Sequence, residues 1–524
     1  MARTARSDVR WWTLAAVALA TFMTSLDNTV VNVALPSIQR DLGLTLAGLE
    51  WITSAYILVF ASLLLAGGRL GDRYGHRTLF LVGLSLFTAA SLLAGLAGTQ
   101  GVLLAGRVLQ GIGAALVTPA TLAIIPATFP DAKQRNLAVA LWSAVAALAL
   151  AVGPLAGGLL SQHWHWSWIF FINVPIGAAT LTLAALAIPK ARDPVAPTLD
   201  LAGLATATVA LFGMTYALIQ GHDAGWTSPP ILAALALATA AGGAFAVVES
   251  RSHAPMVDPT LFRNRVFTGG TLILLLWGLA LIGVYFFTAL YLQTVLGFSP
   301  TKAGLAFVPM ALLMAAVAPL AAPLSERIGA NRTVAAGMGL VAAGLLDAAL
   351  LGAHAGFADL LAPMALLGIG SGLTMPLTAN VLAVLPPDRA GVASGILNAT
   401  REVTGLLGVT VIGALLTARR TQALAAGATP TAAFLHGYTT GLLAAALLVA
   451  IGGAVSLATL DRTATPQPAP AAGTRPARRA AATGSGSRRT NADLAGVRVS
   501  ARTVPPAAAA TAPRIGAAAP AARH

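Results

Sequence analysis

Long apolar runs, separated by short stretches that carry most of the charges, follow one another from Trp11 to Leu460. A helix needs about 20 apolar residues to cross ~30 Å of hydrocarbon, and fourteen runs reach a suitable length. The first run is longer than a signal-peptide core and has no convincing cleavage site after it, so we expect it to be retained. The pattern predicts an all-α polytopic membrane protein with transmembrane helices at 11–33, 49–66, 78–98, 101–126, 136–160, 166–188, 199–220, 229–248, 266–293, 303–322, 332–352, 358–384, 390–418 and 436–460.

Basic residues are distributed unevenly between the two sets of loops. With the N-terminus inside, sixteen Lys and Arg before residue 461 fall in cytoplasmic segments and four fall in outer loops. Loops rich in Lys and Arg stay on the cytoplasmic side of a membrane. We therefore expect a multi-pass protein of the bacterial inner membrane with both termini in the cytoplasm.

Short sequence strings recur at nearly one spacing. GIGAALVTP at 111–119 matches GIGSGLTMP at 368–376, at an offset of 257 residues, and LGDRYG at 70–75 matches LSERIG at 324–329, at an offset of 254. Such recurrence indicates a duplicated six-helix unit, an arrangement found in secondary transporters. We predict an N-terminal six-helix repeat at 1–190, two inserted transmembrane helices with their linkers at 191–260, a C-terminal six-helix repeat at 261–460 and a disordered basic tail at 461–524.

The composition narrows the class of protein. Hydrophobic residues make up 57% and charged residues 10% of 524 positions, and the mean hydropathy of +0.78 fits a membrane-embedded chain. The absence of cysteine excludes disulfides, thiolate metal sites and a cysteine nucleophile. No GxxxxGK[ST] loop occurs, so ATP is not the expected energy source. We expect no enzyme activity, no metal site and no cofactor.

The net charge of +14 is concentrated in the tail, since residues 461–524 carry +8. This segment is rich in Pro, Ala, Gly and Arg and cannot bury enough apolar surface to fold alone. Its basic clusters suit either solvent or anionic lipid headgroups. Nucleic acid is not an expected partner, because no folded basic unit with interleaved aromatic residues is present.

Two opposite charges interrupt the apolar runs at one predicted depth. Asp27, in LDNTVVNVALP, lies about six residues, or ~9 Å, from the outer end of the first span, and Arg107 lies equally far into the fourth span. An intramembrane carboxylate is costly unless it is paired or protonated. We interpret the pair as a proton carrier, with Arg107 biasing Asp27; the alternative is a permanent ion pair that locks the bundle. Gln110, one turn after Arg107, is the expected hydrogen-bonding neighbour.

Several strings together resemble one known family. LDNTVVNVALP, GGRLGDRYGHR (67–77), GRVLQGIGAALVTPA (106–120) and AVGPLAGG (151–158) are similar, in order, to motifs of the fourteen-span drug:proton antiporters of the major facilitator superfamily. The resemblance covers about residues 10–460. It implies the major facilitator fold, two six-helix repeats with two inserted helices, and alternating access powered by the proton gradient.

The resemblance also implies roles for matching residues. The loop after the second span resembles a latch that favours one conformer, and its residues here are Gly68, Asp72, Arg73, Gly75 and Arg77. The fifth span resembles the antiporter motif, which implies a conformational hinge as against a passive kink, and its residues here are Gly153, Pro154, Gly157 and Gly158.

The chain departs from the family pattern at some positions. Ser167 replaces a usual Arg, Glu402 replaces a usual Gln, and the loop motif carries His76 at a usually basic position. Glu402 adds a titratable group near the middle of the thirteenth span, so we include it with Asp27 and Arg107 as a proton-coupling candidate. Arg401 precedes it, and Asn398 lies one turn before Arg401, where it is placed to orient the guanidinium. The candidate substrate-cavity residues are Asn28, Asn32, Tyr56, Gln110, Asn398 and Arg401.

These observations predict a proton-coupled exporter, acting as a monomer, that exchanges protons for an amphipathic drug or antibiotic. Its partners are the small amphipathic substrate, protons and the lipid bilayer. The alternatives are a dedicated exporter of one endogenous metabolite, a transport-dead membrane sensor or scaffold, and solute uptake by symport. The family resemblance of the fifth span disfavours symport.

Overall fold

The computed structural model describes residues 2–189, 200–252, 257, 259–385 and 390–460. The predicted basic tail at 461–524 and most of the linker before residue 200 lie outside this part of the chain. The described residues contain fourteen helices long and apolar enough to cross a membrane and no strand, so the predicted all-α fold class and span number are confirmed.

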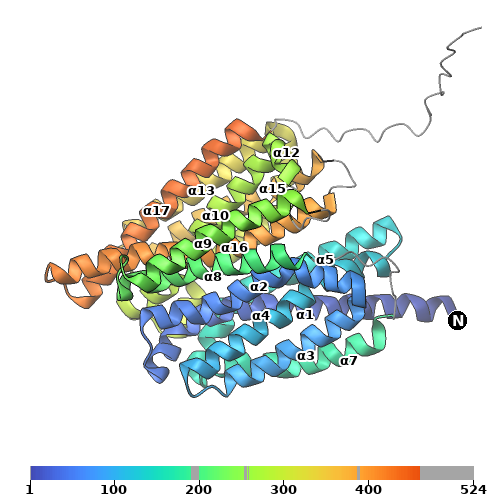
Figure 1. Cartoon of the computed structure of the whole chain (residues 1–524), viewed down its shortest axis with the longest axis horizontal. Helices are drawn as coiled ribbons and strands as arrows, with labels where there is room; N and C mark the ends of the chain where they lie inside the picture. Colours follow the sequence, from blue (N-terminus) through green and yellow to red (C-terminus); the bar gives the residue numbers. More distant parts are fainter. Residues whose placement is uncertain (1, 190–199, 253–256, 258, 386–389, 461–524) are drawn as a thin grey trace, which may run out of the picture. The chain divides into compact units, whose positions relative to one another are not determined.

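The first six spans are built from seven helices (Figure 1). Asp and Thr side chains cap several of them; Thr45, for example, accepts a hydrogen bond from the Gly48 amide at the start of the second helix. The helices are α1 (Ala2–Leu42), α2 (Leu46–Tyr74), α3 (His76–Gly95), α4 (Gln100–Thr128), α5 (Ala132–His163), α6 (Trp168–Phe171) and α7 (Asn173–Ala187).

Two further spans follow, and six more come after them. The inserted pair is α8 (Leu201–Ala224) and α9 (Pro229–Arg251), which pack on each other (Figure 1). Helix α8 also contacts α2 and α16 (Ala390–Ala425). The rest of the described chain forms η1 (Pro259–Arg263), α10 (Arg265–Leu290), the π-helix η2 (Tyr291–Val295), α11 (Pro300–Ala306), α12 (Val308–Ile328), α13 (Ala330–Ala349), η3 (Ala358–Leu360), α14 (Leu361–Thr374), α15 (Pro376–Ala383), α16 (Ala390–Ala425) and α17 (Pro430–Thr459).

The two groups of spans pack in the same pattern. In the first, α1 packs on α5 and α7, α3 packs on α4 and α7, and α2 packs on α4. In the second, α10 packs on α16 and α17, α13 packs on α14 and α17, and α12 packs on α14. The structure thus shows a repeated packing unit; the residue boundaries of the predicted domains stay a prediction.

The sequence repeat is also a repeat of backbone conformation. Gly75 joins α2 to α3 with φ of 90°, and Gly329 joins α12 to α13 with φ of 95°. These positions are 254 residues apart, the offset found in the sequence. A positive φ suits glycine because it has no Cβ to clash. The tight turn after LGDRY and LSERI therefore explains why both strings end in glycine.

We expect Gly75→Ala to lower the free energy of unfolding by about 1–3 kcal/mol, because alanine at this φ is strained. The measurement is the thermal unfolding midpoint of the detergent-solubilised protein. Gly68→Ala is the matched control, since a Cβ there meets only Pro119 at an ordinary 3.7 Å. Equal midpoints for the two variants would show that the Gly75 turn tolerates a side chain.

The first span is longer than its hydrophobic pattern predicted. The sequence placed its end at Val33, whereas α1 continues to Leu42 through Pro36. A proline inside a helix costs ~3 kcal/mol. Leu35 and Ile38 are fully buried, and their packing around Pro36 favours continuation. Asp27 is thus fifteen residues, or about 22 Å, from the end of α1, and the predicted depth of ~9 Å from that end is wrong.

Three predicted spans are interrupted helices. The sixth consists of α6 and α7, the tenth of α11 and α12, and the twelfth includes η3, α14 and α15. In the sixth, tenth and twelfth, a break comes just before Pro175, Pro309 and Pro376 respectively. Proline cannot donate a backbone hydrogen bond, so the helix restarts with proline in its first turn.

Candidate functional site

A buried polar network lies among α1, α2, α4 and α7. Asp27 on α1 and Arg107 on α4 are both 0% exposed, and Arg107 Nη1 lies 2.5 Å from Asp27 Oδ2. Gln110 Nε2 donates to Asp27 Oδ1 at 2.9 Å, and Asn173 Nδ2 donates to the same oxygen at 2.9 Å. Three donors from two helices therefore surround one carboxylate.

The guanidinium of Arg107 is held on several sides. Its Nε donates to the Ile52 carbonyl at 3.2 Å, and its Nη1 also donates to Gln110 Oε1 at 2.9 Å. The ring of Tyr56, which is 1% exposed, lies with its centroid 4.4 Å from the Arg107 Cζ. The Ile52 carbonyl and the Tyr56 ring both belong to α2, so this helix supplies both a hydrogen-bond acceptor and a cation–π contact to the guanidinium.

Gln110 links the network to α3. Its Nε2 also donates to Ser91 Oγ at 2.8 Å, and the Ser91 hydroxyl donates to the Phe87 carbonyl at 2.8 Å. A buried ion pair repays its desolvation only when its remaining donors and acceptors are satisfied. Here the hydrogen bonds of the network come from five helices, α1, α2, α3, α4 and α7.

The comparison with known proteins assigns the chain to a family. Residues 17–409 match the sequence model of the Major Facilitator Superfamily. The chain belongs to the Major Facilitator Superfamily. This match confirms the predicted family resemblance. The members of this superfamily are transporters, so the chain is a transporter.

Its relatives within the superfamily include proteins named for export or for drug resistance. The Tetracenomycin C resistance and export protein of Streptomyces glaucescens is 37% identical over 424 residues, which cover 80% of this chain and 79% of that protein. The Cephamycin export protein CmcT of Amycolatopsis lactamdurans is 38% identical over 416 residues, which cover 78% and 86%. The Multidrug resistance protein Stp of Mycobacterium tuberculosis (strain CDC 1551 / Oshkosh) is 37% identical over 407 residues, which cover 78% and 76%.

Solved structures show the same fold. A bacterial homolog to the human lysosomal transporter Spinster, crystallised in an inward-facing and unoccupied conformation, superposes with a TM-score of 0.62 at 18% identity. The match covers 86% of this chain and 97% of that one. At this identity the likeness concerns the fold alone.

The loop motif predicted to act as a latch lies at the α2–α3 turn and makes local contacts. Asp72 lies 3.4 Å from His76 Nε2 across the turn, and Arg73 lies over the ring of Tyr74. Arg77 Nη2 donates to the Ala185 carbonyl of α7 at 2.8 Å. The motif thus ties α2, α3 and α7 together, and its role as a latch stays a prediction.

The motif of α5 provides close contacts with two other helices. A Cβ at Gly153 would collide with the Thr29 side chain, and one at Gly157 would collide with the Val30 carbonyl, both on α1. A Cβ at Gly158 would collide with the Pro300 carbonyl on α11, in the other half. Pro154 takes part in the reciprocal contact, because a Cβ at Gly304 of α11 would collide with its carbonyl. The contacts assign a packing role to all four residues, and the hinge stays a prediction.

The remaining predicted residues lie apart from the network or touch it indirectly. Asn32 Nδ2 donates to the Asn28 carbonyl of its own helix at 3.4 Å, so the structure gives these two no hydrogen bond to Asp27. Arg401 is exposed, and the structure gives no hydrogen bond from the half-buried Asn398 that would orient it. Glu402 is partly buried and interacts electrostatically with Tyr56 and Arg401. Only Gln110 and Tyr56 of the predicted cavity residues contact the Asp27–Arg107 pair.

Sequence reasoning missed Asn173 and Ser91. Asn173 lies in the apolar string FINVP, and a single amide side chain in such a string could have indicated a buried hydrogen-bonding role. Ser91 gave no signal, because serine satisfies itself within many membrane helices by bonding to its own backbone.

An apolar cavity of about 540 Å³ lies beside the inserted helices. Its walls come from α2, α8, α9, α10 and α16, and its apolar side chains include Leu211, Phe245 and Leu272. Thr400 and Val403, which flank Arg401 and Glu402, belong to its wall as well. In the part of the chain that the structure describes, no group of three or more His, Asp or Glu residues is arranged to hold a metal ion.

Proposed function

We propose that the chain is a proton-coupled exporter that exchanges protons for an amphipathic drug or antibiotic. The observation that carries this proposal is the buried Asp27 carboxylate, which accepts hydrogen bonds from Arg107, Gln110 and Asn173. Intramembrane acids of this kind mark proton pathways. The relatives named as export and resistance proteins support the direction and the class of substrate.

Proton exchange at Asp27 is coupled to packing in this proposal. When Asp27 is ionised, it holds α1 against α4 and α7; when it is protonated, the charge attraction to Arg107 is lost and these helices are released. Arg107 stays charged, because a guanidinium does not deprotonate in proteins. The change in attraction between helices then favours a different arrangement of the two halves.

The second part of the proposal is alternating access. Gln293 of η2 donates to the Val33 carbonyl of α1 at 2.7 Å, and Gln162 of α5 accepts from the Thr301 amide at 3.1 Å, so the halves meet toward the end of the bundle where α1 and α5 finish. We infer that these contacts close this end, which the charge bias assigns to the outside, with both termini in the cytoplasm. The apolar cavity beside α8 and α9 suits an amphipathic molecule.

The proton gradient is the proposed energy source, with no cofactor. One charge moving through 100 mV gains ~2.3 kcal/mol, which supports a concentration ratio of about fiftyfold. We propose a monomer in the inner membrane, with the substrate, protons and lipid as its partners and no nucleic acid.

The test is transport by purified protein in proteoliposomes, with an imposed pH gradient and a panel of amphipathic antibiotics. We expect substrate movement and opposite proton movement, both abolished by an uncoupler. Transport of one compound would indicate a dedicated exporter, and transport of many a multidrug exporter. Compound binding without proton movement would instead support a sensor or scaffold.

A further inference from the structure

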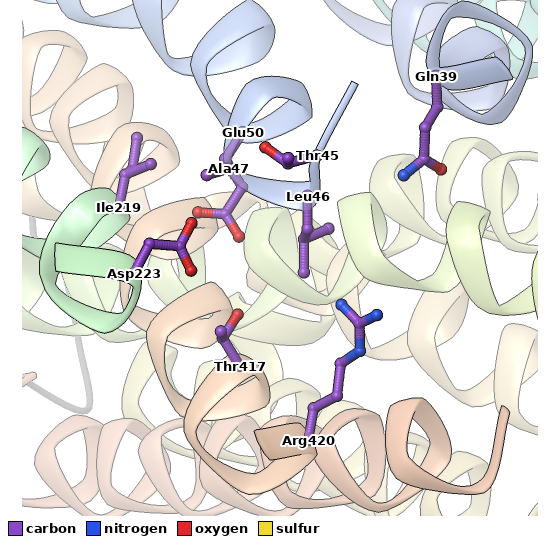
Figure 2. Close-up of a pocket in the computed structure, with 9 residues that line it drawn as sticks. All are labelled: Gln39, Thr45, Leu46, Ala47, Glu50, Ile219, Asp223, Thr417 and Arg420. Carbon is purple, nitrogen blue, oxygen red and sulfur yellow. The ribbon is translucent and has the colours of Figure 1, made fainter. Parts of the chain in front are cut away.

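A second cavity, which is lined by charged groups, lies at the α1–α2 end of the bundle (Figure 2). Its volume is about 320 Å³. Charged groups reach it from three parts of the chain: Glu50 on α2, Asp223 on α8 and Arg420 on α16. Figure 2 shows the Glu50 carboxylate beside that of Asp223, with the Arg420 side chain rising from α16 at the other side of the cavity. No part of the function proposed above uses this cavity.

Glu50 is the unusual member of this cavity. It is only 3% exposed, yet among the described residues neither a hydrogen bond nor an ion pair reaches its carboxylate. Burying a carboxylate without a partner is costly. Its side chain lines the cavity, so a group placed there can supply the missing partner.

The surrounding charges define the chemistry of that partner. The exposed Asp223 carboxylate interacts electrostatically with Glu50, which gives this side of the cavity two acids. Arg420 is half-buried, and its Nε has no hydrogen-bond partner in the described structure. The cavity therefore offers acceptors for a cation at one side and a buried donor at the other.

We propose that this cavity binds an organic ammonium ion, with Glu50 as its buried counter-charge, Asp223 at the entrance and Arg420 available to an acceptor on the same ligand. An ammonium group has no acceptor atom and up to three donors, so it matches two carboxylates. Ile219 and Leu46 give the cavity an apolar surface for the carbon skeleton.

The position of the cavity connects binding to conformation. Glu50 belongs to the first group of spans, Asp223 to the inserted pair and Arg420 to the second group. A ligand that contacts all three stabilises the arrangement in which these helices meet. The inference that the bound amine is a substrate rests on the proposed export function. The inference that the amine binds here does not depend on that function.

The test is binding of phenethylammonium to the full-length protein in lipid nanodiscs, measured by ligand-observed NMR titration. Phenethyl alcohol and phenylacetate have a similar skeleton without the positive charge. We expect the ammonium ion to bind more tightly than both, and Glu50→Gln to weaken its binding by about tenfold or more, as expected for a lost charge-assisted hydrogen bond. Asp223→Asn should weaken it less, because Asp223 is exposed.

Asp359→Asn is the matched control, because Asp359 is an exposed acid at the same end that does not line the cavity. Equal binding of the ammonium ion and the alcohol, or binding unchanged in Glu50→Gln, would overturn the proposal. Loss of ammonium binding in Asp27→Asn but not in Glu50→Gln would assign it to the central network and also overturn it. If Glu50-dependent binding occurs without any proton-coupled transport, the site stands and the proposed export function fails.

Discussion

Replacing Asp27 with asparagine is expected to reduce proton-coupled export in proteoliposomes to the background rate. An amide cannot take up and release the proton, and it offers one acceptor oxygen where the carboxylate offers two. Arg107 would then remain buried without a counter-charge, and breaking a buried pair costs about 3–5 kcal/mol. The same variant is therefore expected to lower the thermal unfolding midpoint.

Loss of transport alone does not separate proton carriage from a purely structural ion pair, so a second variant is required. Asp27→Asn combined with Arg107→Gln removes both charges and should recover much of the lost stability. If Asp27 carries the proton, the double variant is folded but still inactive. If it transports substrate against a pH gradient at a rate near that of the wild type, the pair is only structural and the mechanism proposed here is wrong.

Asn173 offers a milder test of the same network. Asn173→Ala removes one donor to Asp27 and leaves the charge pair in place. A neutral hydrogen bond contributes about 1 kcal/mol, so we expect a loss of roughly fivefold in transport and a shift in its pH profile. A purely structural role would lower stability without moving the pH profile.

The second large effect is expected at the contact between α5 and α11. Gly158→Leu places a side chain against the Pro300 carbonyl and the Thr301 Cα, where backbone atoms cannot move aside cheaply. Overpacking of this kind costs about 1–3 kcal/mol, which lowers the equilibrium constant for the closed arrangement by roughly 5- to 150-fold. We expect transport to fall by about fivefold or more in a protein that remains folded.

The closed arrangement can be measured directly, because the chain has no cysteine of its own. Spin labels attached through His163→Cys and Lys302→Cys, both exposed in the structure, report the separation of α5 and α11 by electron paramagnetic resonance. Gly158→Leu should lengthen this distance. Gly243→Leu is the control, because a Cβ at Gly243 of α9 meets nothing within 4 Å. An unchanged distance with normal transport in Gly158→Leu would exclude this contact from the transport cycle.

The limits of the sequence-based prediction are clearest in α1. Hydrophobicity predicted that the span exists but placed its end nine residues early, because Pro36 and the polar residues after it are typical of a helix end. The buried side chains of Leu35 and Ile38 instead continue the helix. Packing against other helices outweighs a local breaker, and a single-segment pattern contains no information about that packing.

The polar site was likewise predicted from the sequence only in part. The sequence predicted Asp27, Arg107 and Gln110 as neighbours from equal depth and helical spacing. The structure places them in contact, although the depth predicted for Asp27 was wrong. Arg401 and Asn398 were predicted with Gln110 as substrate-cavity residues, and the structure shows no hydrogen bond between them and Gln110 or the Asp27–Arg107 pair. Which neighbours a residue on α16 meets depends on how that helix packs on the others, and its own sequence does not contain this information.

The sequence by itself determined the number of spans, the internal repeat and the two buried charges, because membrane thickness and helical periodicity act within one segment at a time. Only the tertiary structure decided that Asn173 and Ser91 complete the Asp27 network and that Glu50, Asp223 and Arg420 share a cavity. These groups lie on helices far apart in the chain. The packing of whole helices brings them within hydrogen-bonding or electrostatic reach, and no local pattern encodes it.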